Sequence, residues 1–416
     1  MKLKINTLAW WIVAILIAIL PFHAFLYTYL HSFFWNDSWV IFAQAWKEIL
    51  VGILGILALV NWWGNWHLPK QKSWWLALSF VILAGIYAAL GSGEITQKVL
   101  GLRSATLFLQ AFITLPFFEF SNEKWDRLKK IAIAASSLVI AFALAQKFFL
   151  PPDFLSHFGY STNVSSWLPG GNLPMYHLIG ETGGMRLQST LAGPNQLAAY
   201  LLVIFPLAWL VLRGEKNKYW QWTAGFTLIG GGATLFWTFS RSAWVGLFAL
   251  GITFAIFAWK KNLSVKLRKR LLLGIFLAVI ATASVVFLQP SFRENILRKS
   301  STSAHLTRSV EAAKLVIANP LGLGLGETAG VSQRFDTEKN EGITPENTYL
   351  GIALETGWLG GMLFLALLGS LLIELNQKKS PLFYSLIGIA VIALFLHPLE
   401  DSATSLIIFL LASKEI

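Results

Sequence analysis

Long runs of apolar residues, separated by short polar segments, recur along the whole chain. Many are close to the roughly 20 residues that a helix needs to cross a hydrocarbon core about 30 Å thick. Because lipid offers backbone groups no hydrogen-bond partners, such spans fold as helices. The pattern predicts an all-α polytopic membrane bundle of about twelve transmembrane helices, near residues 8–31, 39–61, 73–91, 99–120, 131–150, 196–213, 220–239, 242–259, 271–289, 348–375, 382–398 and 402–413.

Composition agrees with a membrane protein. Of the 416 residues, 55% are hydrophobic and 13% are charged, whereas soluble domains carry about 25% charged residues. The chain also has 19 tryptophans, a residue that favours the membrane–water interface. No cysteine is present, which excludes disulfides and thiol catalysis within this sequence.

Basic residues dominate the charge balance, with a formal net charge of +12. They gather in short segments that fall on one side of the membrane if the spans alternate, so topology rather than nucleic-acid binding explains the excess. We expect that side to be the cytoplasm, with both termini there. We also expect an uncleaved first span, because the apolar stretch after Lys4 is too long for a signal peptide. The basic segments are 70–72, 124–130, 213–218, 260–270 and 378–379.

Two long segments are expected on the outer face, and long loops are often functional. The predicted organisation is spans 1–5 in residues 1–150, a first outer loop in 151–195, spans 6–9 in 196–289, a second outer loop in 290–347, and spans 10–12 in 348–416. The second loop holds apolar residues at helical spacing from Leu306 to Ile317, which predicts an amphipathic helix on the membrane surface, ended by Asn319 and Pro320. Intrahelical ion pairs on a solvated face are the simpler explanation of its charges.

Several polar residues stand near or within the apolar runs. Thr344 is predicted to cap the tenth span, which places Glu346 in its first turn. That carboxylate would either complement the helix dipole or act as a general base. Lys47, Glu48 and Glu355 lie inside predicted spans, where charges are costly without partners, so they neutralise one another or serve function.

Four segments, taken in order, resemble the O-antigen ligase/polymerase superfamily of integral membrane glycosyltransferases. They comprise Arg186 to Ala198, Ser240-Arg241, Arg308 with the glycines of 322–326, and Glu346 to Gly357. Roughly residues 40–410 share the resemblance, and the ordered set is more specific than any one motif. The alternate glycines do not match a dinucleotide-binding fingerprint.

The resemblance implies a glycan donor on polyprenyl pyrophosphate and a lipid, glycan or protein acceptor, at the outer face of the bacterial inner membrane. No metal or cofactor is implied. Arg241 and Arg308 match the two arginines of the family that hold the pyrophosphate, and Glu346 takes the position of the base. Ligases carry His-Asn where this chain has Glu346-Asn347, which leaves a polymerase open and makes His305 a substitute candidate for the base. The residues assigned to substrate binding are Arg186, Asn195, Asn347, Gly322 and Gly324.

A transporter or flippase of a lipid-linked solute is the rival class. Buried Lys47, Glu48 and Glu355 would suit an ion-coupled carrier. Transporters are often built from internal repeats, and the sequence shows no clear one. The favoured prediction is a glycosyltransferase of surface-polysaccharide or lipopolysaccharide synthesis.

Overall fold

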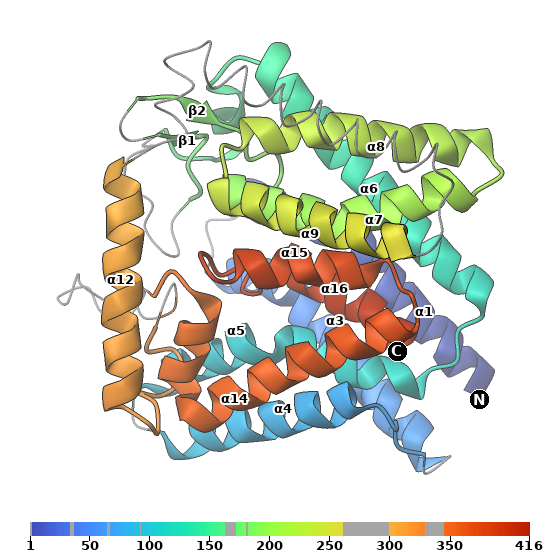
Figure 1. Ribbon diagram of the computed structural model, residues 1–416, viewed down its shortest axis with the longest axis vertical. Helices are drawn as coiled ribbons and strands as arrows, with labels where there is room; N and C mark the ends of the chain where they lie inside the picture. Colours follow the sequence, from blue (N-terminus) through green and yellow to red (C-terminus); the bar gives the residue numbers. More distant parts are fainter. Residues whose placement is uncertain are drawn as a thin grey trace.

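The computed structural model describes residues 2–33, 37–64, 67–91, 93–162, 172–179, 182–260, 299–328, 331 and 345–416, and the account below concerns these. It is almost wholly helical, as predicted (Figure 1). The elements are α1 (Lys2–Ile19), η1 (Leu20–Phe22), α2 (His23–Phe33), α3 (Asp37–Trp63), α4 (Lys72–Leu90), α5 (Ile95–Thr114), η2 (Leu115–Phe117), α6 (Asn122–Phe148), η3 (Phe154–Phe158), β1 (His177–Leu178), β2 (Met185–Arg186), α7 (Pro194–Gly214), α8 (Lys218–Trp237), α9 (Arg241–Lys260), α12 (Lys299–Ala318), α14 (Thr348–Gln377), α15 (Leu382–Ile392) and α16 (Ser402–Glu415).

Seven helical stretches in the described part are long and apolar enough to cross a membrane, and α9 and α15 contain shorter apolar stretches. Side chains such as Ile56, Ile82 and Leu138 are exposed on these helices, which suits a surface that meets lipid rather than water. Helices α8 and α16 coincide with two further predicted runs but are less apolar or shorter. The run at 271–289 lies outside the described residues, so the number twelve stays a prediction.

The long helices lie side by side, and α12 runs crosswise over their ends (Figure 1). Both chain ends lie on the side away from α12 and from the small β1–β2 hairpin. Helix α7 forms the centre of the bundle, where its residues from Leu197 to Ile204 are all buried. The predicted amphipathic segment falls within α12, which ends at Ala318, immediately before Asn319 and Pro320.

Two interruptions change the course of helices in the bundle. Pro21 lies in the short 3-10 turn that divides the first apolar run into α1 and α2. Gly357 breaks α14 with a φ of 69°, a left-handed conformation that favours glycine. A Cβ at Gly357 would lie 2.6 Å from the carbonyl oxygen of Pro320, so the segment after α12 packs directly on this bend.

Candidate functional site

Three predicted candidates meet at one point. Arg308 Nη1 lies 2.5 Å from Glu346 Oε1, and His305 Nδ1 contacts Glu346 Oε2. The two α12 residues are three apart and therefore share a helix face, and that face is turned toward the start of α14. The arrangement joins α12 to the start of α14. It also leaves His305 and Arg308 competing for one carboxylate.

The cap of α14 differs from the prediction. Asn347, not Thr344, is the N-cap, because its Oδ1 accepts hydrogen bonds from the backbone N–H groups of Tyr349 (2.9 Å) and Leu350 (3.1 Å). Glu346 therefore lies just before the helix rather than in its first turn. Asn347 Nδ2 donates to the carbonyl of Leu394 at 3.1 Å. This side chain, assigned to substrate binding, holds α14 against the segment that follows α15.

A cavity of about 710 Å³ opens beside Glu346. Its walls come from the junction of α1 and α2, from α3 and α5, from the start of α7, and from the segment between α15 and α16. A space of this size holds a small ligand such as one or two sugar rings. The titratable and amide side chains that line it are His23, Lys47, Arg103, Asn195, Gln196, Glu346, His397, Glu400 and Asp401.

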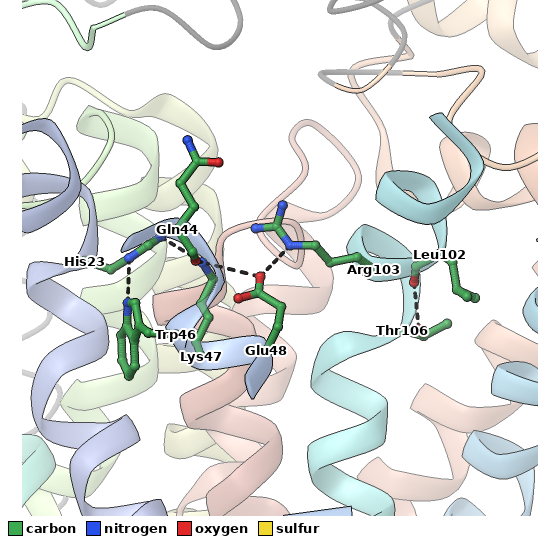
Figure 2. A network of polar contacts seen from close by, with 8 residues as sticks. All are labelled: His23, Gln44, Trp46, Lys47, Glu48, Leu102, Arg103 and Thr106. Carbon is green, nitrogen blue, oxygen red and sulfur yellow. Dashed lines mark hydrogen bonds and ion pairs between the residues drawn. The ribbon is translucent and has the colours of Figure 1, made fainter. Parts of the chain in front are cut away.

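Lys47 and Glu48 are tolerated inside the bundle because they belong to a network at the cavity wall (Figure 2). Lys47 is 1% exposed, and its Nζ lies 2.7 Å from His23 Nε2, 3.0 Å from the Gln44 carbonyl and 3.5 Å from Glu48 Oε1. Arg103 Nε donates to the same Glu48 oxygen at 2.5 Å. The expectation that Lys47 and Glu48 neutralise each other holds, but Arg103 is a third member that the sequence reasoning missed.

Glu355 takes no part in that network. Its Oε1 accepts hydrogen bonds from Thr328 Oγ1 (2.8 Å) and from the backbone N–H groups of Gly326 (3.2 Å) and Thr328 (3.4 Å). The carboxyl thus fastens the glycine-rich segment to α14. This placement favours the structural alternative for Glu355.

Gly322 and Gly324, assigned to substrate binding, are not among the described residues that line the cavity. A Cβ at Gly322 would lie 2.5 Å from the backbone nitrogen of Gly357. Both glycines have positive φ angles, 81° and 117°. Close backbone packing and left-handed turns account for glycine at these positions.

Arg186 and Asn195 are joined directly. Arg186 Nη2 donates to Asn195 Oδ1 at 2.8 Å, and its Nε donates to the Thr238 carbonyl at 2.8 Å. The β1–β2 hairpin positions Arg186, and the first turn of α7 positions Asn195. Arg241 begins α9, three residues after Thr238, and is not among the described cavity-lining residues. The described side chains thus place Asn195 at the cavity, with Arg186 behind it.

Comparison with known proteins points to one family. Residues 226–365 match the family model described as O-antigen ligase. Over that segment the chain is similar to O-antigen ligases. The matched segment contains Arg241, Arg308 and Glu346, whereas Arg186, Asn195 and the Lys47 network lie outside it. A search of curated proteins found no match. Together with the apolar helices, this similarity indicates a multi-pass membrane protein.

Two carboxyls of this O-antigen ligase relative were not anticipated. Glu400 and Asp401 lie in the short segment before α16 and line the cavity. Burial within the protein raises the pKa of Glu400 to about 7. Burial also raises the pKa of Asp401, whose Oδ2 accepts hydrogen bonds from Thr404 N (2.9 Å) and Oγ1 (2.7 Å) as the cap of α16. Their only signal in the sequence is a polar interruption between two apolar runs.

Proposed function

We propose that the protein is a glycosyltransferase of the cell envelope. It moves a glycan from polyprenyl pyrophosphate to an acceptor hydroxyl, at the outer face of the bacterial inner membrane. The observation that carries the proposal is the convergence of Arg308, His305 and Glu346 beside a cavity large enough for a sugar. The similarity of residues 226–365 to O-antigen ligases supports the same chemistry.

The proposed reaction is a displacement at the anomeric carbon. The acceptor oxygen forms a bond to that carbon, the bond to the phosphate oxygen breaks, and the polyprenyl pyrophosphate leaves with the electron pair. The acceptor proton passes to Glu346. Positive groups fixed near the leaving phosphate stabilise the charge that develops there, and arginine offers it planar pairs of donors. We assign this role to Arg308 and Arg241.

The Arg308–Glu346 ion pair fits the state before the donor binds. A pyrophosphate carries more negative charge than one carboxylate, so it competes well for the guanidinium. Transfer of Arg308 to the phosphate would leave Glu346 free to accept the acceptor proton. His305 contacts the other carboxylate oxygen, and in this scheme the proton transfer does not require it.

The identity of the acceptor distinguishes a polymerase from a ligase. A polymerase would use a second carrier-linked glycan, whereas a ligase would use another envelope acceptor. A glycan profile of a strain lacking the gene tests this. Loss of long polymer with single repeats retained indicates a polymerase, and intact polymer left on its polyprenyl carrier indicates a ligase.

A transporter stays the alternative, because a polar cavity with buried charges also suits a carrier. The test is reconstitution of the purified protein with carrier-linked glycan extracted from the strain lacking the gene. Formation of a new glycosidic bond, with release of polyprenyl pyrophosphate, supports the transferase. Movement of intact carrier-linked glycan across the bilayer, with no bond formed, would refute it.

A further inference from the structure

Part of the cavity wall has no role in the proposed transfer step. Arg103 on α5 and Glu400 before α16 both line the cavity, and neither is in contact with the Arg308–Glu346 pair among the described residues. Both face a space that their own neighbours do not fill. They are therefore available to a ligand.

The guanidinium of Arg103 has hydrogen-bond donors that the described residues do not use. Its Nε is bound to Glu48, and no described residue accepts a hydrogen bond from its two terminal nitrogens. Figure 2 shows one of these nitrogens directed away from Glu48. Glu48, which also pairs with Lys47, holds Nε of Arg103. The rest of the guanidinium is therefore held in place.

Glu400 supplies a hydrogen-bond acceptor. Its carboxylate makes no hydrogen bond to any described residue, although neighbouring Asp401 is occupied as a helix cap. Nearby His397 also has a buried Nε2 without a partner in the described structure. The cavity thus offers free donors and a free acceptor together. That combination matches hydroxyl groups, which both donate and accept.

The charges around the cavity indicate whether it favours an anionic ligand. The cations are Lys47, Arg103 and Arg308, and the carboxylates are Glu48, Glu346, Glu400 and Asp401. Three cations face four carboxyls, two of which, Glu400 and Asp401, have raised pKa values, so the net charge of the cavity stays close to zero. No strong positive charge therefore favours an anionic group over an uncharged polyhydroxylated ligand.

We propose that Arg103 and Glu400 bind an uncharged sugar of the acceptor through its hydroxyl groups. The proposal rests on the proposed transfer reaction and adds a subsite to it. The pyrophosphate then stays with Arg308 and Arg241, and the acceptor sugar lies between Glu346 and the Arg103–Glu400 wall. A carboxylate on the sugar at this position would bring no large gain in affinity.

The charge balance can be measured without any substrate. The chain has no cysteine, so Ser104→Cys places a single thiol at the cavity wall beside Arg103. Its labelling rates with a sulfonate and with a trimethylammonium methanethiosulfonate are compared, each normalised to free 2-mercaptoethanol. We expect no preference for the sulfonate, and a shift toward it in Glu400→Gln. A preference for the sulfonate of more than about tenfold would show an anion site and overturn the proposal.

The binding role is tested by transfer kinetics. Carrier-linked glycan from the strain lacking the gene is the donor, and the glycan-bearing envelope fraction of that strain is the acceptor. Glu400→Gln and Arg103→Gln should raise the acceptor KM by about 10- to 100-fold, with kcat and donor KM nearly unchanged. Arg103→Lys keeps the charge but loses the planar pair of guanidinium donors, so it should also raise the acceptor KM. Glu123→Gln and Arg127→Gln remove an exposed pair on α6 and are the matched controls.

The outcomes separate the two proposals. A higher donor KM with an unchanged acceptor KM would place the pyrophosphate here and overturn the sugar subsite. Loss of kcat without change in acceptor KM would make Glu400 a catalytic group and also overturn it. If the wild-type protein transfers no glycan, the proposed function fails, whereas the thiol measurement still reports on the cavity.

Discussion

Replacement of Glu346 by glutamine separates a structural ion pair from a catalytic base. Arg308 is 51% exposed and Glu346 is 23% exposed, so water screens much of their attraction. Such a pair stabilises a fold by about 0–1 kcal/mol. Loss of a general base lowers the rate by about 10²–10⁴-fold, which equals about 2.7–5.5 kcal/mol in the transition state. The two roles therefore predict very different ratios of lost activity to lost stability.

The assay is transfer from a purified carrier-linked donor, with the thermal midpoint measured on the same preparation. We expect Glu346→Gln to lose most transfer while its midpoint changes little. Glu346→His should regain part of the transfer activity. The acid limb of its pH–rate profile should lie at higher pH, because imidazole titrates near 6.5 and an unperturbed glutamate near 4.3. His305→Ala, the control on the neighbouring contact, should retain most activity.

A thermodynamic cycle adds a second check. Because Arg308 and Glu346 act in one step, the double variant Arg308→Gln/Glu346→Gln should be scarcely slower than either single variant. Normal turnover by Glu346→Gln would refute the assignment of the base. If His305→Ala were inactive in the same assay, the role would pass to that histidine.

Four further predictions address other parts of the molecule. Arg241→Ala should lower transfer strongly at unchanged protein level; wild-type transfer would exclude a role at the pyrophosphate. Gly357→Ala should destabilise the protein by about 1–2 kcal/mol or more, seen as a lower thermal midpoint, because φ is positive and the Cβ would meet Pro320. Burial raises the pKa of Glu400 to about 7, so the folded state binds a proton that the unfolded state releases; stability should fall as pH rises from about 4.5 to 7, and Glu400→Gln should make that fall smaller. A cysteine at Glu311 on α12 should react with an impermeant reagent in intact spheroplasts, whereas one at Glu123 should require permeabilisation, and the reverse pattern would invert the topology.

The sequence predicts the helices well because lipid imposes a simple requirement. A span must be apolar over about 20 residues, and no tertiary contact is needed to recognise that. The same reasoning placed the helix now seen as α12, since its apolar period is local. It could not establish that Arg308 meets Glu346, because 38 residues separate them and only the fold joins the two segments.

The residues that were missed share one property. Arg103 lies in one predicted span and Glu48 in another, and the cost of each charge disappears only when α3 and α5 are packed together. Glu400 stands in a short turn between two apolar runs, where a polar residue is unremarkable. The assignment of Gly322 to substrate binding stays a prediction. What the structure shows at this position is close packing of the backbone at Gly322 against the backbone at Gly357.

The division of the site between two parts of the chain has a consequence for specificity. The segment matched to the O-antigen ligase family, residues 226–365, holds the proposed chemical groups Arg241, Arg308 and Glu346. The remaining cavity wall, including Arg103 and Glu400, lies outside it. A catalytic group must meet the same reacting atoms in every member that transfers glycan from polyprenyl pyrophosphate, whereas the wall meets whichever acceptor that member uses. Under the proposed mechanism, exchange of the wall residues should change which acceptor is used. Exchange of the residues in the matched segment should change only the rate of transfer.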